Sequence, residues 1–358
     1  MKIVSIETKI VEFDRVKVFK VAYSKGSIKS RNVYVRVNTD EGIYGIGEAS
    51  PSSQVTGETI DGVVCMVNYL AKELVGEDPT DIAKIHEIMD KRLIRNPAAK
   101  AAIDIACYDI MGKKAGMPVY KLLGATEKTF QTDITLGIDT VEESVREAKE
   151  RVGEGFRILK VKIGNDPERD ITVIKEIRKA VGDDIEIRVD ANQGYDIETA
   201  MRVLTEIKKY GVIEAEQPLP YYDVHGLAEL RSISPIEIMA DECVHGPIEA
   251  EIACQHNACD IVNIKLMKCG GIYPALKIAD IAERYGKTCI VGCMSESKAA
   301  IAAGAAVLLA RKNIVAADLD SFFSFKNPEV GVTGAFSVDK DMITLYDKPG
   351  FGFDEFAF

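Results

Sequence analysis

The chain has 358 residues, 47% of them hydrophobic and 28% charged, and its formal net charge is −11. This length allows a large core and more than one domain, and the composition is that of an ordinary globular protein. The negative charge argues against nucleic acid or an anionic membrane as a partner, because both bind basic surfaces. We find no signal peptide and no apolar run long enough to span a membrane, so we expect a cytoplasmic protein.

The N-terminal part of the chain predicts a small α+β unit. Hydrophobic residues alternate as in β-strands at residues 2–7, 32–37 and 43–48. The period then changes to that of helices at residues 59–75, 79–93 and 96–114. The last of these segments is rich in alanine, so its backbone can approach a neighbouring element closely. We expect this unit to cover residues 1–125.

From residue 129 onward, apolar strand segments alternate with helices rich in Glu, Lys and Arg. The predicted strands are 129–138, 158–163, 185–190, 213–216, 236–241, 260–265, 288–293 and 314–318. The predicted helices are 140–152, 167–180, 196–210, 224–232, 247–256, 272–285 and 296–310. Eight strands at the pitch of β-α units predict a (β/α)8 barrel over residues 126–325. The aromatic tail 326–358 has no place in such a barrel, so we expect it to pack back on the N-terminal unit.

Three carboxylates end three consecutive predicted strands, at Asp190, Glu216 and Asp241. The active sites of parallel barrels lie at the rim formed by the strand C-termini. Neighbouring carboxylates there repel each other unless a cation lies among them, and Mg²⁺ takes such ligands. The alternative is that each residue is a helix N-cap or a solvated rim charge.

Two lysines end strands that face each other across the predicted barrel. Lys162 ends the second strand and Lys265 the sixth, and Lys160 projects from the same face of its strand as Lys162. Two amines on opposite sides of one substrate suit removal of a proton from one face of a carbon and its return to the other. The alternative is that these are ordinary strand-end lysines that extend to solvent.

At these residues the chain resembles the enolase superfamily, in its muconate lactonizing enzyme subgroup. The motifs that carry the resemblance are Lys160-Val161-Lys162, Asp190-Ala191-Asn192, Glu216-Gln217-Pro218, Ala240-Asp241-Glu242 and Asn263-Ile264-Lys265. The resemblance implies an α/β protein with a modified (β/α)8 TIM barrel and an α+β N-terminal capping domain completed by the C-terminal tail. It also implies Mg²⁺ held by the three carboxylates, and an enolate formed by proton abstraction next to a carboxylate, with lysine as the base.

The segment Asp318-Leu319-Asp320 follows the eighth predicted strand. In an extended segment both aspartates lie on one face, where they can bind an ammonium group. Here the chain resembles dipeptide epimerases, in which such a pair holds the free α-amino group of the substrate. The same resemblance implies that Thr135, Lys160 and Cys293 line the substrate. The alternatives are a solvated turn for the aspartates and core packing for Cys293.

The first loop of the N-terminal unit departs from one branch of these epimerases. Enzymes of the family that prefer Ala-Glu carry an arginine in this loop, and the corresponding place here falls near Ser24, with Lys25 beside it. A lysine makes a point-charge contact, whereas an arginine can hold a carboxylate through two hydrogen bonds. A preference for glutamate is therefore not predicted.

Together these patterns predict a Mg²⁺-dependent epimerase that inverts the α-carbon of the second residue of L-Ala-Xaa dipeptides. The alternatives within the subgroup are an N-acylamino acid racemase, an o-succinylbenzoate synthase or a cycloisomerase, whose substrates lack a free ammonium. An inactive binding protein of the same fold is disfavoured, because all three carboxylates and both lysines are present. The expected partner is a small dipeptide, and a homo-oligomer is compatible with the sequence.

Overall fold

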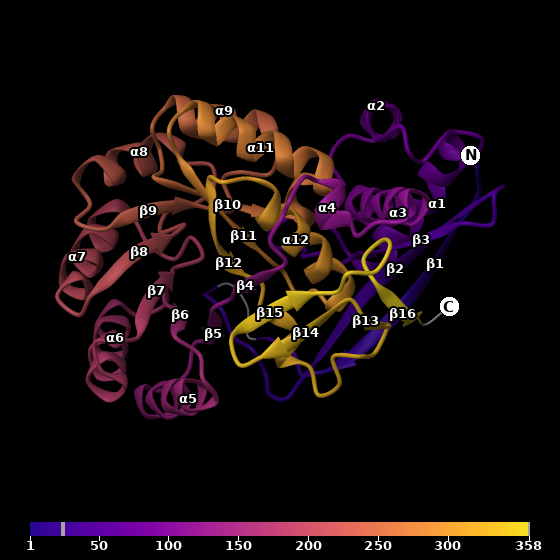
Figure 1. Ribbon diagram of the computed structural model, residues 1–358. Helices are drawn as coiled ribbons and strands as arrows, with labels where there is room; N and C mark the ends of the chain where they lie inside the picture. Colours follow the sequence, from indigo (N-terminus) through magenta and orange to yellow (C-terminus); the bar gives the residue numbers. More distant parts are fainter. Residues whose placement is uncertain (23–25, 357–358) are drawn as a thin grey trace.

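The computed structural model describes residues 1–22 and 26–356, and its N-terminal part is an antiparallel sheet covered by helices (Figure 1). The sheet has the order β1-β2-β3, and its strands are β1 (Ile3–Asp14), β2 (Lys29–Thr39) and β3 (Tyr44–Ala49). The helices that follow are α1 (Ile60–Leu74), α2 (Ile82–Arg92), α3 (Pro97–Ala115) and the short α4 (Val119–Leu122).

Helix α3 lies unusually close to strand β3. A Cβ atom on Gly45 would lie 1.9 Å from the carbonyl oxygen of Ala106, and one on Gly47 would lie 1.9 Å from that of Ala102. Glycines on the strand and alanines on the helix therefore permit backbone contact. The close approach expected from the alanine-rich segment is confirmed.

Within the described residues, eight parallel strands form one sheet in chain order. They are β5 (Ile134–Leu136), β6 (Ile158–Lys162), β7 (Glu186–Asp190), β8 (Val212–Glu216), β9 (Glu237–Ala240), β10 (Ile261–Lys265), β11 (Thr288–Gly292) and β12 (Ile314–Asp318). A single bridge between Thr132 and Ala317 joins the two edges, and the Leu319 N–H donates to Thr132 Oγ1 at 2.9 Å. The barrel predicted from the strand pitch is confirmed and is nearly closed.

Helices follow the first seven barrel strands. They are α5 (Val141–Glu154), α6 (Pro167–Val181), α7 (Ile197–Lys208), α8 (Val224–Ile233), α9 (Pro247–Gln255), α11 (Ile272–Arg284) and α12 (Lys298–Ala310), with the short α10 (Leu266–Cys269) directly after β10. Among the described residues, no helix is both long and apolar enough to cross a bilayer.

The first barrel strand is shorter than the sequence pattern predicted. The apolar segment 129–138 is divided into β4 (Thr129–Gln131) and β5, and β4 pairs with β15 (Met342–Leu345) of the tail instead of joining the barrel. The prediction of one strand was wrong because β4 is paired with a segment far away in the sequence. Thr132 and Asp133, which lie between the two strands, are fully buried.

The tail contacts both the barrel and the N-terminal part. The short helix η1 (Ser321–Ser324) leads into it, and its strands are β13 (Val332–Gly334), β14 (Phe336–Asp339), β15 and β16 (Phe353–Phe356). The Val119 N–H donates to the Gly350 carbonyl at 2.9 Å, and the Phe351 N–H donates to Asp109 Oδ1 at 3.0 Å. We propose residues 1–125 with 326–358 as the capping domain and residues 126–325 as the barrel domain.

Two buried acids attach the N-terminal elements to barrel helices. Glu48, at the end of β3, accepts the N–H groups of Ser297 and Ala300 at the start of α12, each at 2.9 Å. Asp104, in α3, accepts the Ile272 N–H at 2.6 Å at the start of α11. Carboxylates are favoured at helix N-termini because unpaired N–H groups point outward there. These contacts hold the capping elements against the barrel.

Candidate active site

The three predicted metal ligands lie together at the C-terminal rim of the barrel. Asp190 and Glu216 are paired in register at the ends of β7 and β8, and Asp241 follows β9 directly. All three residues are at most 1% exposed. Asp190 Oδ1 accepts the backbone N–H of Asn192 at 2.8 Å, and Glu216 Oε1 accepts the Asn263 side chain at 2.9 Å. The rim therefore gathers three oriented oxygen ligands.

Three lysines reach into the same cluster. Lys160 Nζ lies 2.6 Å from Asp318 Oδ2, 2.7 Å from Glu216 Oε2 and 3.3 Å from Asp190 Oδ2. Lys162 donates to Asp190, and Lys265 Nζ lies 2.8 Å from Asp241 Oδ2. Since β6 and β10 lie four places apart in the eight-stranded sheet, Lys162 and Lys265 approach one pocket from opposite sides.

The pKa values show how strongly these buried charges interact. Burial, and then the charge of Asp190, raises the pKa of Glu216 to about 8. Burial would also raise the pKa of Asp190, but the ammonium groups of Lys162 and Lys160 lower it to about 2. Burial would lower the pKa of Lys160, yet the carboxylates of Asp318 and Glu216 raise it well above its usual range. The three buried carboxylates therefore repel one another and are stabilised by nearby positive charge. Their oxygen atoms form a donor set that fits a hard divalent cation.

Several supporting residues were missed by the sequence analysis. Lys268 Nζ donates to Asp241 Oδ1, and Gln217 Oε1 accepts the Asp241 N–H at 3.0 Å. Asn192 donates to buried Glu242 at 3.1 Å. Gln217, Asn192 and Glu242 lie within the motifs that carry the family resemblance, so the sequence could have indicated that they belong to the site. Nothing in the local pattern indicated Lys268, which depends on the short helix α10.

The backbone at the rim is also specialised. Asn192, two residues after Asp190, and Gln217, directly after Glu216, have positive φ values of 41° and 36°, which non-glycine residues adopt rarely. A Cβ atom on Gly292 would lie 2.5 Å from Asn263 Oδ1 and 2.9 Å from Lys265 Cε. Glycine at the end of β11 therefore leaves room for Lys265 and for the side chain that supports Glu216.

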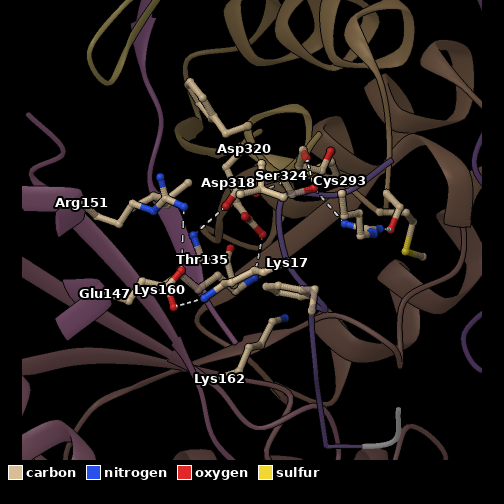
Figure 2. Close-up of a pocket in the computed structure, with 18 of the residues that line it drawn as sticks. Lys17, Thr135, Glu147, Arg151, Lys160, Lys162, Cys293, Asp318, Asp320 and Ser324 are labelled. Atoms are coloured by element: carbon tan, nitrogen blue, oxygen red, sulfur yellow. Dashed lines mark hydrogen bonds and ion pairs between the residues drawn. The ribbon is translucent and has the colours of Figure 1, made fainter. Parts of the chain in front are cut away.

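Asp318 and Asp320 both line the pocket, together with Thr135 and Cys293 (Figure 2). Strand β12 ends at Asp318, and Asp320 has helical backbone angles, so the two do not alternate along one extended strand as predicted. Asp320 is held instead by the Thr135 N–H, which donates to Oδ2 at 2.6 Å. Their side chains still come together because the nearly closed edge of the barrel carries both.

The Cys293 thiol is a weak donor to Asp320, with Sγ 3.9 Å from Oδ1. Burial and the negative charges of Asp318 and Asp320 raise the pKa of this thiol well above its usual range, so it stays protonated. Burial and the charge of Asp318 also raise the pKa of Asp320. The remaining substrate-binding predictions, Ser24 and Lys25, lie outside the described residues.

Both parts of the chain match known protein families. The family "Mandelate racemase / muconate lactonizing enzyme, N-terminal domain" matches residues 5–124, and "Enolase C-terminal domain-like" matches residues 143–355. The chain belongs to the mandelate racemase and muconate lactonizing enzyme group of the enolase superfamily. It is an enzyme of the racemase and epimerase type within that superfamily.

Relatives of this superfamily cover almost the whole chain. A hydrophobic dipeptide epimerase of Enterococcus faecalis is 41% identical over 98% of this chain and 99% of its own length. An L-Ala-D/L-Glu epimerase of Clostridium acetobutylicum is 40% identical over 94% of both chains. An N-succinyl-L-Arg/Lys racemase of Bacillus cereus is 37% identical over 99% of this chain and 95% of its own length.

Solved structures agree with this assignment. The Enterococcus faecalis dipeptide epimerase complexed with Mg and L-Leu-L-Tyr superposes with a TM-score of 0.96 at 39% identity, covering 99% of this chain and 100% of the other. A substrate-liganded L-Ala-D/L-Glu epimerase of Bacillus subtilis gives a TM-score of 0.97 at 34% identity, with both chains fully covered. The chain therefore belongs among superfamily members whose named relatives are mainly dipeptide epimerases.

Proposed function

We propose that this enzyme is a Mg²⁺-dependent dipeptide epimerase that inverts the α-carbon of the second residue by two-base proton transfer. The observation that carries the proposal is one pocket lined by Lys162 and Lys265 from opposite sides and by Asp318 and Asp320 at its wall. The lysines suit a reaction at a carbon between them. The aspartates suit a substrate that carries an ammonium group.

Asp190, Glu216 and Asp241 would hold the metal, because all three are buried oxygen donors at adjacent strand ends. When bound, Mg²⁺ supplies positive charge that stabilises the substrate carboxylate as the α-proton leaves and disfavours protonation of the nearby lysines. Asn263 and Lys268 keep Glu216 and Asp241 oriented. Supporting contacts of this kind normally tune a metal site.

Lys162 and Lys265 would act as the two bases. One removes the α-proton from one face of the second residue, and the other returns a proton to the opposite face, which inverts the configuration. Each ammonium group lies beside a proposed metal ligand, Lys162 beside Asp190 and Lys265 beside Asp241. Both amines are thus held near the rim instead of extending into solvent.

Asp318 and Asp320 would bind the free amino group of the first residue. Thr135 and Cys293 hold Asp320, and Lys160 holds Asp318, so both carboxylates are oriented towards the pocket before substrate arrives. An N-acylamino acid racemase is the competing reading, because one such relative is 37% identical. An acylated nitrogen carries no charge and would give these carboxylates no ammonium group to bind. The same objection applies to o-succinylbenzoate synthase and cycloisomerase substrates.

Deuterium exchange in a dipeptide library tests the proposal directly. With Mg²⁺ in D₂O, free dipeptides should gain one deuterium at the second α-carbon and yield the epimer, which mass spectrometry and chiral chromatography detect. Exchange into N-acylamino acids with no exchange into any dipeptide would contradict it. The cytoplasmic location and the homo-oligomer stay predictions.

A further inference from the structure

The active-site pocket continues beyond the amino-group position towards helix α5. Past Thr135 it reaches Glu147 and Arg151, which lie to the left of Asp318 and Asp320 in Figure 2. The same pocket is lined by the apolar side chains of Val16, Phe19, Ile134 and Phe323. If the amino group lies at the aspartates and the reacting carbon between the lysines, this extension is the space left for the side chain of the first residue.

An ion cluster closes the outer end of the extension. Glu147 is 8% exposed and forms an ion pair with Lys17, and Arg151 Nη2 lies 3.8 Å from Glu147 Oε1. Lys17 belongs to the irregular segment after β1, whereas the other two side chains come from α5. We call Lys17, Glu147 and Arg151 the end cluster. It connects the capping side of the pocket to the barrel side.

We propose that this extension is an apolar subsite for the first residue and that the end cluster excludes charged side chains from it. The inference rests on the proposed dipeptide epimerase function and names its substrate class as dipeptides with a large aliphatic first residue. A cationic side chain would have to replace Lys17 on Glu147 while facing Arg151. An anionic side chain would lose its hydration and find both cations already paired, Lys17 with Glu147 and Arg151 with Glu154 at 2.8 Å. An aliphatic side chain meets neither penalty and covers the apolar wall.

The first arm of the test measures kcat/KM for dipeptides that share one second residue and begin with L-Ala, L-Leu, L-Lys or L-Glu. L-Leu should exceed L-Ala by about tenfold, because additional methylene groups are buried, and L-Lys and L-Glu should fall at least about tenfold below L-Leu. A preference for L-Ala over L-Leu would overturn the inference.

The second arm changes the charges of the end cluster. Glu147→Gln leaves Lys17 without its acid, while Arg151 keeps Glu154 at 2.8 Å, so L-Glu should gain about tenfold relative to L-Leu. Lys17→Met leaves Glu147 without its closest partner, so L-Lys should gain relative to L-Leu. Glu150→Gln is the matched control, because its side chain lies on the same helix with 58% exposure and pairs with Arg146. The control should leave every ratio unchanged.

Each ranking is a ratio of kcat/KM values for two dipeptides measured on one protein preparation. A variant that is partly unfolded therefore lowers both values equally and leaves the ratio unchanged. If neither variant shifts its ratio while dipeptides are still epimerised, the end cluster does not select the first residue. The inference is then wrong, while the proposed epimerase function still holds. If no dipeptide is epimerised by the unmodified enzyme, the proposed function fails and the inference falls with it.

Discussion

The two halves of the barrel interior differ sharply in the layer below the C-terminal rim. Strands β6 to β8 and the residue before β5 place charged side chains there, namely Lys160, Arg188, Glu214 and Asp133. Strands β9 to β12 place apolar ones there, namely Met239, Ile261, Ile290 and Ala316, which pack together as a separate small core. The rim itself does not follow this division, because proposed metal ligands and bases stand above both halves.

The charged half contains interactions that an ordinary barrel core lacks. Arg188 Nε donates to Glu186 at 2.7 Å and lies 3.4 Å from Glu214 Oε1, and its Nη1 lies 3.9 Å from Asp133 Oδ2. Burial and the negative charges of Asp318 and Asp320 hold the pKa of Asp133 well above its usual range. The comparison teaches that the small apolar core is held by packing, whereas the charged half depends on balanced buried charge, which is costly to disturb.

The largest expected effect is that of losing the metal site, whose proposed ligands stand above both halves. We expect kcat/KM to fall by about a thousandfold or more when Mg²⁺ is removed with a chelator, because the developing negative charge loses its main stabilisation. The same loss is expected for Asp190→Asn, Asp241→Asn and Glu216→Gln. Steady-state epimerisation measures this. Ile290→Val in the apolar half is the control and should keep activity within about twofold. Full activity in excess chelator would refute the metal assignment.

A smaller effect is expected where the two halves meet, at Asp318 and Asp320. Acetylating the amino group of a good dipeptide should lower kcat/KM by about a hundredfold, because charge-assisted hydrogen bonds to the ammonium are lost. Changing both aspartates to Asn should narrow the difference between the free and acetylated substrates. The coupling in this cycle measures the contact between amine and aspartates. Equal turnover of both substrates by the unmodified enzyme would favour the racemase alternative.

Stability should separate the two halves most clearly. Arg188→Met removes the guanidinium beside Glu214 and Asp133 and should cost about 3 to 5 kcal/mol in the free energy of unfolding. Met239→Leu, in the same layer of the apolar half, should cost less than about 1.5 kcal/mol. Denaturant titration of the Mg²⁺-free protein compares them. Similar costs for the two variants would show that the charged half has no special energetic role.

The smallest expected effect concerns the capping side, at Ser24 and Lys25. Without an arginine there, L-Ala-L-Glu should be turned over within about tenfold of L-Ala dipeptides whose second residue is apolar. Competition among a set of Ala-Xaa substrates measures the ratios. A preference for Ala-Glu far beyond this range would mean that another group holds the glutamate side chain.

The sequence was most informative where each residue's position follows from chain length. Every β-α unit needs a similar number of residues, so the spacing alone places the strand ends at Lys162, Asp190, Glu216, Asp241 and Lys265 on one rim. Their types then pointed to a cation and two bases. Both inferences needed only the order of strands in a barrel.

Features that depend on distant partners could not be predicted in this way. The break between β4 and β5 arises because β4 pairs with β15 near the end of the chain. Glu147 and Lys17 have the pattern of ordinary surface charges, and their pairing depends on how the capping segment lies over α5. Arg188 and Glu214 looked like polar positions in short strands, because the sequence does not show that one half of the barrel interior is charged.

Proton exchange by the two lysine variants tests the central claim most directly. Lys162 stands above the charged half and Lys265 above the apolar half, yet they should play equivalent roles on opposite faces of one carbon. In D₂O with Mg²⁺, Lys162→Ala should exchange deuterium into one epimer of a dipeptide and Lys265→Ala into the other, and neither variant should interconvert the epimers. If each variant exchanged deuterium into both epimers, the two-base mechanism would be contradicted.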